Sequence, residues 1–270
     1  MLLSRPLPRV FRPARRGGGR LVLACLLSAA AMAPVLSISG AGVLPVQAAE
    51  PSSSQLRSLE AALNGQGDLA SILTQGPGLD PALVMQRRTT LLQRFPDARW
   101  QLSPGEPLRD GRSTVNLQVT GTRQEGPTTY RLQAEQQLAL ESDGRRITAQ
   151  SVIREQSVLR SGKAELPVSL LIPDAVLTGQ RYDVDVIFDN PLDGAIAAGG
   201  IVALSGDQLA SLDNPELQLG ALGGGGLFKT VQAPFAPGEQ TWAVLLVHPE
   251  GIVSATKRVR VVADRAQLKL

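Results

Sequence analysis

The chain has 270 residues, of which 43% are hydrophobic and 19% are charged, so it can fill the core of one large domain or two ordinary ones. This composition excludes a protein that is disordered throughout. The net charge of +3 arises in the first 20 residues, which contain six arginines. Without these six, the 27 basic and 24 acidic residues become 21 and 24, a net charge of −3. The charge balance therefore does not indicate nucleic-acid binding.

Residues 1–48 are predicted to be a secretory signal peptide. An arginine-bearing start precedes the apolar run LVLACLLSAAAMAPVL and a stretch of small residues that ends at Ala48. We place the cleavage after Ala48, and a cut after Ala33 is disfavoured because Pro34 follows it. The mature protein is thus expected outside the cytoplasm, in the periplasm or secreted. An uncleaved membrane anchor and a twin-arginine signal at residues 15–16 are the alternatives.

Cys25 is the only cysteine and belongs to the predicted signal peptide. The mature chain would therefore contain no disulfide, no thiol nucleophile and no cysteine ligand for zinc. An exported protein of this kind must be held together by its hydrophobic cores alone.

Three helices are predicted at the start of the mature chain. Each begins at a residue that can cap the free backbone N–H groups: a serine near residue 52, Asp68, and Asp80 followed by Pro81. Leucines and other apolar residues recur on one face of each, and the third helix is expected to end near Arg94.

Strands are predicted next, at 99–103, at 113–122 and in a long hairpin over 131–159. Asp143-Gly144 suits a two-residue hairpin turn. That turn predicts that Gln136 pairs with Ser151 and that Leu132 pairs with Glu155. This register places apolar residues opposite one another in three of five pairs, which favours the hairpin.

Helices followed by an antiparallel sheet of about four strands resemble the nuclear transport factor 2-like (cystatin-like) α+β cone. The resemblance covers residues 52–160 and depends on the element order, on Trp100 in the first strand and on the DGRRI turn at 143–147. It implies a curved sheet with helices on its concave side, around either a packed core or a pocket.

Residues 163–263 contain only strand-like runs separated by glycine, proline and aspartate turns, and the chain is predicted to divide near Ser161-Gly162. Six or seven strands in about 100 residues resemble an immunoglobulin-like β-sandwich without a disulfide. We therefore expect four parts: a signal peptide (1–48), the α+β domain (49–162), an all-β sandwich (163–263) and a tail (264–270).

Few residues are suited to catalysis. His248 is the only histidine, and a catalytic triad would have to be assembled across the two domains. Aspartates at 183, 185, 189 and 193 alternate along a strand without a calcium-binding loop, so no metal and no cofactor are expected. Single-stranded nucleic acid is not expected either, because too few aromatic residues accompany the basic ones.

The predicted hairpin face combines apolar and polar residues, which leaves two hypotheses open. In the first, the polar residues lie at an open rim or satisfy one another. In the second, they line a pocket in which Glu155 is a general base and Tyr130 donates a hydrogen bond to a developing oxyanion, as in ketosteroid isomerase. The candidate pocket residues are Trp100, Tyr130, Gln136, Ser151 and Glu155.

The expected function is that of an exported, non-enzymatic binding or scaffold protein. Its α+β domain would bind a protein partner or a small apolar ligand, and the sandwich would be a spacer or adhesion module. Contact with a membrane is expected only through an uncleaved signal segment. The alternative is a cofactor-independent isomerase or hydrolase that uses a pocket in the first domain.

Overall fold

A computed structural model describes residues 49–162, 166–190, 195, 197–211, 215–222 and 225–269. The predicted signal peptide, residues 1–48, lies outside the described residues. Within the described part of the chain, no helix is both long enough and apolar enough to cross a membrane.

Four α-helices, twelve strands and a short 3₁₀ helix are described. The helices are α1 (Ser53–Leu63), α2 (Leu69–Ile72), α3 (Pro81–Arg94), α4 (Gly206–Ser211) and η1 (Arg265–Lys269). The strands of the first half are β1 (Arg99–Pro104), β2 (Val115–Glu125), β3 (Thr128–Ser142) and β4 (Ile147–Gly162). The later strands are β5 (Val168–Leu171), β6 (Ala175–Leu177), β7 (Arg181–Phe188), β8 (Ala198–Leu204), β9 (Gly220–Ala221), β10 (Gly226–Gln232), β11 (Gly238–His248) and β12 (Gly251–Val262).

The three predicted N-terminal helices are confirmed, together with their caps. The side chains of Ser52, Asp68 and Asp80 each accept a backbone N–H at the start of a helix, and Pro81 occupies the first turn of α3. The apolar faces of these helices pack on β1–β4 in one core cluster, which includes the fully buried Phe95. This space between helices and sheet is filled by side chains.

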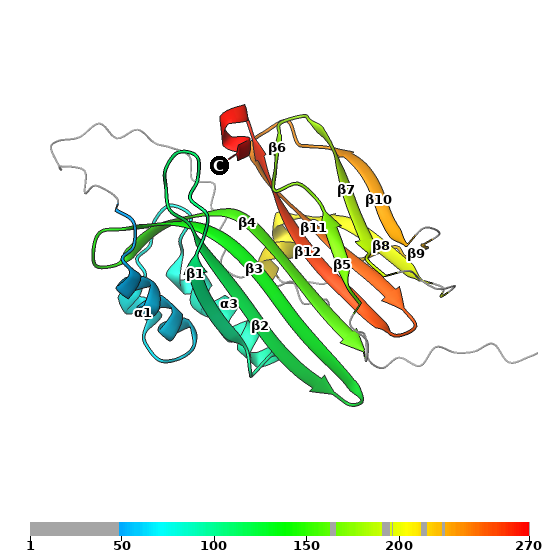
Figure 1. Cartoon of the computed structure of the whole chain (residues 1–270), viewed down its shortest axis with the longest axis horizontal. Helices are drawn as coiled ribbons and strands as arrows, with labels where there is room; N and C mark the ends of the chain where they lie inside the picture. Colours follow the sequence, from blue (N-terminus) through cyan, green and yellow to red (C-terminus); the bar gives the residue numbers. More distant parts are fainter. Residues whose placement is uncertain are drawn as a thin grey trace, which may run out of the picture.

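The predicted fold class, an α+β cone followed by a separate sandwich, is wrong. One nine-stranded, mostly antiparallel sheet runs through both halves in the order β1-β2-β3-β4-β12-β11-β8-β9, and β6 pairs with β12 (Figure 1). The last strand of the first half, β4, pairs antiparallel with the last strand of the chain, β12. The edge of the first sheet that a cone would leave open is thus extended by the second half.

A second sheet, of order β10-β7-β5, packs on the far half of the long sheet. The core between these two layers contains Trp242 and Val244, as the sequence predicts, and the inward residues of β7. Because Val158 of β4 also packs against this core, the second layer begins over the first half of the chain. Strand β4 therefore belongs to both cores: one of its faces packs against the helices, and the other contacts the core between the two sheets. The predicted domain boundary near residue 162 stays a prediction.

The hairpin of β3 and β4 exists, but its predicted register is wrong. Four residues, 143–146, join the strands, and the Asp143 carboxylate accepts the backbone N–H groups of Arg145 and Arg146 at 2.8 and 2.6 Å. These bonds hold the pKa of Asp143 below its ordinary value. Two bulges follow, between Gln137 and Leu138 and between Glu141 and Ser142. The four-residue turn moves the register by two residues relative to a two-residue turn, and each bulge adds one more residue in β4, so Gln136 pairs with Glu155 and no longer with Ser151.

Candidate functional site

Two of the five predicted pocket residues come together in the structure. Gln136 and Glu155 are cross-strand partners, and the amide of Gln136 donates to the Glu155 carboxylate at 2.7 Å. Both side chains are buried, with 2% and 5% of their surface exposed. Their face of the sheet is the one that packs against the helices, where a buried carboxylate needs a charged partner.

Arg258 of β12 supplies that partner. Its guanidinium lies 3.3 Å from the Glu155 carboxylate and also forms an ion pair with Glu239 of β11. The Arg258 side chain is itself 8% exposed. Glu155 is therefore bound by an amide and a guanidinium that come from opposite halves of the chain, an arrangement suited to holding the sheet together rather than to accepting a proton from a substrate.

The other three predicted residues lie apart from this pair. Tyr130 is the cross-strand partner of Ser161, six residues along the strand from Gln136, which corresponds to about 20 Å. Trp100 is buried in the helix-packed core, and the guanidinium of Arg88 lies 5.8 Å from the centre of its ring. Ser151 is exposed beside a bulge. The structure does not assemble these five residues into one pocket.

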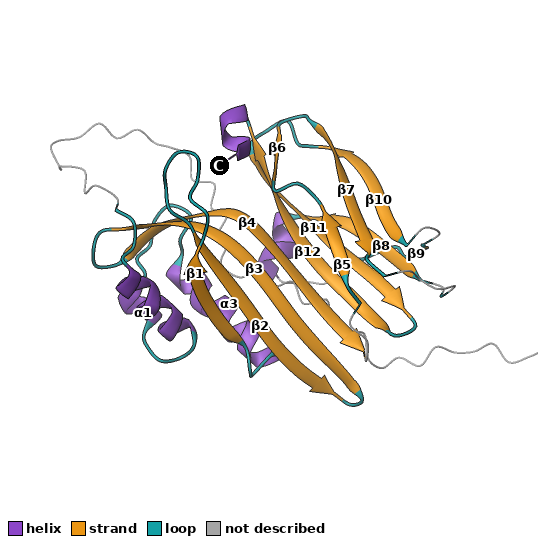
Figure 2. Ribbon diagram, in the orientation of Figure 1, coloured by secondary structure: helices purple, strands orange, loops and turns teal. Residues whose placement is uncertain are grey.

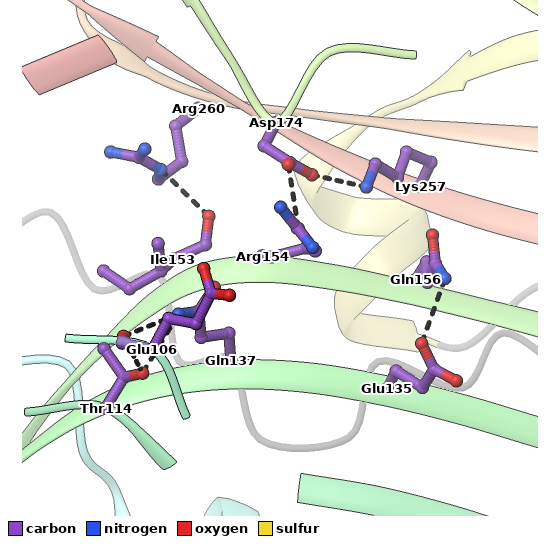
Figure 3. Close-up of polar contacts among 10 residues, drawn as sticks. All are labelled: Glu106, Thr114, Glu135, Gln137, Ile153, Arg154, Gln156, Asp174, Lys257 and Arg260. Carbon is purple, nitrogen blue, oxygen red and sulfur yellow. Dashed lines mark hydrogen bonds and ion pairs between the residues drawn. The ribbon is translucent and has the colours of Figure 1, made fainter. Parts of the chain in front are cut away.

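Beyond the paired segment, β4 and β12 diverge, and side chains bridge the gap between them. Pairing runs from Gly162 and Gly251 to Gln156 and Lys257. Next to its end, Asp174 forms ion pairs with Arg154 of β4, at 2.8 Å, and with the buried Lys257 of β12 (Figure 3).

Arg260 makes a further bridge across this gap. Its Nε donates to the carbonyl of Ile153 in β4 at 3.1 Å (Figure 3). Burial lowers the pKa of Arg260 below its ordinary value, the charge of Arg258 adds to that effect, and Asp174 opposes it. Charged side chains thus replace the backbone hydrogen bonds where the two strands separate.

The opposite face of β1–β3 is largely exposed, and the second layer begins to cover it at β4. Figure 2 shows helix α3 behind these strands. The alternation of buried and less buried residues places the remaining side chains on the face away from the helices. On this side lie Arg99, Gln101 and Ser103 of β1; Asn116, Gln118, Thr120 and Thr122 of β2; Arg131, Gln133, Glu135 and Gln137 of β3; and Gln156, Val158 and Arg160 of β4. All except Val158 are polar, so this face has the composition of a hydrated binding surface or a solvated wall.

One end of this face is hollowed into a pocket of about 560 Å³, which we call the arginine pocket. It is lined by Asp97, Arg99, Thr120, Gly121, Thr122, Arg131, Leu132, Gln133, Arg160 and Pro167. Strands β1–β4 form its floor, and Pro167, just before β5, contributes from the second half of the chain. The pocket therefore lies beside the place where the second sheet begins.

The arginine pocket carries an excess of positive charge. Among the described residues, none of its three arginines forms an ion pair with a carboxylate. Within the described part of the chain, the side chain of Arg160 donates to the carbonyl of Leu166, at 3.1 Å, and that of Arg99 to the carbonyl of Ala98, at 3.4 Å. Asp97, the carboxylate among the described lining residues, accepts the backbone N–H of Thr122 at 2.8 Å.

Two of these arginines oppose each other directly. Arg131 of β3 and Arg160 of β4 are cross-strand partners on the same face. Like charges in this position destabilise a sheet by a few tenths to about 1 kcal/mol. Guanidinium groups present a planar fork of donors that matches carboxylate, sulfate and phosphate oxygens. The two guanidinium groups therefore repel each other, and an anion bound between them would remove this repulsion.

Sequence reasoning missed this pocket because the predicted register places Gln156 opposite Arg131. A hairpin with two bulges brings Arg160 there instead. In the correct register, Thr122, Arg131 and Arg160 lie side by side on three neighbouring strands. Two adjacent arginines without an acidic neighbour among these three residues would have identified the pocket.

The described residues contain no candidate metal site, and His248 packs against an aromatic ring. No group of three or more histidine, cysteine, aspartate or glutamate side chains in this part of the chain is arranged to hold a metal ion. Asp183 accepts a hydrogen bond from Thr230 at 2.7 Å, and Asp193 lies outside the described residues. The ring of His248 packs on Phe188, with 5.8 Å between centroids.

Comparison with known protein families matches part of the chain. Residues 163–262 match a family described as a domain of unknown function (DUF8623). No curated protein matches the chain. The family match covers the second half only, and the arginine pocket lies mainly on the first.

Proposed function

We propose that this is a non-enzymatic binding protein and that the arginine pocket receives an anionic group of its ligand. The observation that carries the proposal is that Arg99, Arg131 and Arg160 line one pocket without a carboxylate partner in the described part of the chain. Charge-assisted hydrogen bonds to such a group contribute about 1.5–3 kcal/mol each. An anion would also remove the repulsion between Arg131 and Arg160.

The proposal replaces the apolar ligand expected from the sequence with an anionic one, since apolar side chains fill the space under the sheet. The proposal also includes export by the predicted signal peptide, and a role for the second half of the chain as a spacer or adhesion module. An isomerase or hydrolase has less support, because Glu155 is bound to Gln136 and Arg258 and lies far from Tyr130.

Calorimetric titration of the protein with sulfate and with inorganic phosphate, at low salt, tests the proposal. We expect binding that weakens as sodium chloride is added, because salt screens an exposed charged pocket. Replacement of Arg131 by glutamine is expected to lower the affinity about tenfold to a hundredfold, the loss of one charge-assisted hydrogen bond.

Arg181→Gln is the matched control, since Arg181 is an exposed strand arginine on β7, outside the pocket. It is expected to bind both anions as the unaltered protein does. Equal affinity for Arg131→Gln and the unaltered protein, or no heat of binding in any titration, would refute the proposed function.

A further inference from the structure

The three arginines of the pocket fall into two groups. Arg131 and Arg160 are direct cross-strand partners, so their Cβ atoms are about 5 Å apart. Arg99 lies on β1, two strands from Arg131 and one row further along, because it pairs with Thr120, which pairs with Gln133. Strand and residue spacings place its Cα about 12 Å from that of Arg131. The pocket thus has two separate positions for an anionic group, one at Arg131 and Arg160 and one at Arg99.

Neutral polar side chains lie between these two points. Thr122 pairs with Arg131, and Thr120 and Gln133 occupy the row that leads to Arg99. All three side chains are exposed. Among the described residues, their side chains have few partners: only Gln133 bonds to another side chain, its amide donating to Glu135 at 3.1 Å. Hydroxyl and amide groups bind the hydroxyls of a ligand, whereas a continuous row of anionic groups would require cations here.

We propose that the ligand of the arginine pocket is an acidic oligosaccharide, held at two of its anionic groups. One carboxylate or sulfate would bind between Arg131 and Arg160, and a second, on a neighbouring sugar, would bind Arg99. The hydroxyls between them would meet Thr120, Thr122 and Gln133. This inference rests on the proposed function and adds to it the chemical class of the ligand. Two linked contacts strengthen binding because the second becomes intramolecular.

Calorimetry with galacturonic acid and with its linear tetramer tests the two-point arrangement. The tetramer is expected to bind at least about tenfold more tightly than the monomer, after correction for its four carboxylates. Arg99→Gln is expected to abolish this advantage, so that the tetramer binds no more tightly than the monomer once its four carboxylates are taken into account. Arg131→Gln is expected to weaken both ligands, and Arg181→Gln neither. A neutral tetrasaccharide of galactose, the matched ligand without charge, is expected not to bind.

The outcomes separate this inference from the proposed function. If sulfate binds but the tetramer is no tighter than the monomer, or if Arg99→Gln weakens both equally, the two-point oligosaccharide is overturned and the anion pocket stands. Tighter binding of tripolyphosphate than of the tetramer, at equal charge, would assign the pocket to a polyphosphate instead and would also overturn the inference. If sulfate, phosphate and uronate all fail to bind, both proposals fall.

Discussion

Replacement of Arg258 by alanine is expected to lower the free energy of unfolding by about 3–5 kcal/mol. The change removes the guanidinium that pairs with the buried Glu155 and with Glu239, so the Glu155 carboxylate loses this ion pair. An uncompensated buried charge is among the costliest defects that a single substitution can create. Urea unfolding, followed by tryptophan fluorescence, measures the loss.

A second variant separates lost charge pairing from lost packing. Replacement of both Arg258 and Glu155 by methionine removes the two charges together and keeps much of their volume. It is expected to be less destabilised than Arg258→Ala, because both charges of the buried ion pair are removed together. Arg181→Ala, on an exposed strand surface, is expected to change stability by less than about 0.5 kcal/mol. Equal stability of Arg258→Ala and Arg181→Ala would contradict a stabilising role for this ion pair.

Replacement of Gly162 by alanine is expected to lower the free energy of unfolding by about 2–3 kcal/mol or more. Gly162 has a φ of +110°, and a Cβ there would lie 2.2 Å from the carbonyl oxygen of Glu250. It is also the partner of Gly251, where pairing between β4 and β12 begins. The added methyl group must therefore push the two strands apart at the end of their shared ladder.

Gly144→Ala is the matched control for this substitution. Gly144 also has a positive φ, +87°, but a Cβ there meets nothing within 4 Å. It is expected to show only the backbone cost of a left-handed conformation, about 1–2 kcal/mol. Chemical denaturation of the two variants side by side measures the difference. If Gly162→Ala is no less stable than Gly144→Ala, the close approach of β4 and β12 is not present in solution.

Local elements of this fold could be predicted from the sequence because their signals lie within a few residues. Ser52, Asp68 and Asp80-Pro81 mark helix starts by capping chemistry, and alternation marks the long strands. The pairing of β4 with β12 could not be predicted in this way. It joins residues about 100 positions apart, such as Ser157 and Thr256, whose hydroxyls bond at 2.6 Å. A strand sequence does not show which distant strand will cover its edge.

The candidate site was predictable only in part, and for the same reason. The sequence identifies Gln136 and Glu155 as polar residues on an otherwise apolar face, which the structure places together. It could not supply Arg258, which comes from the other end of the chain. The arginine pocket depends on a turn of four residues, which shifts the register by two relative to the predicted turn, and on two bulges in β4, which shift it by one residue each. A register inferred from the turn alone therefore separates Arg131 from Arg160.

The arginine pocket is tested most directly by NMR of the arginine side chains during titration with sulfate. We expect the Nε–H signals of Arg131 and Arg160 to move with a common saturation curve, because both guanidinium groups line the same pocket. The signals of Arg181, outside the pocket, and of Arg258, which is paired with Glu155, are expected to stay in place. Saturable shifts at Arg131 and Arg160 would support anion binding between them. Unmoved signals at both, or shifts confined to Arg258 and Arg260, would contradict it.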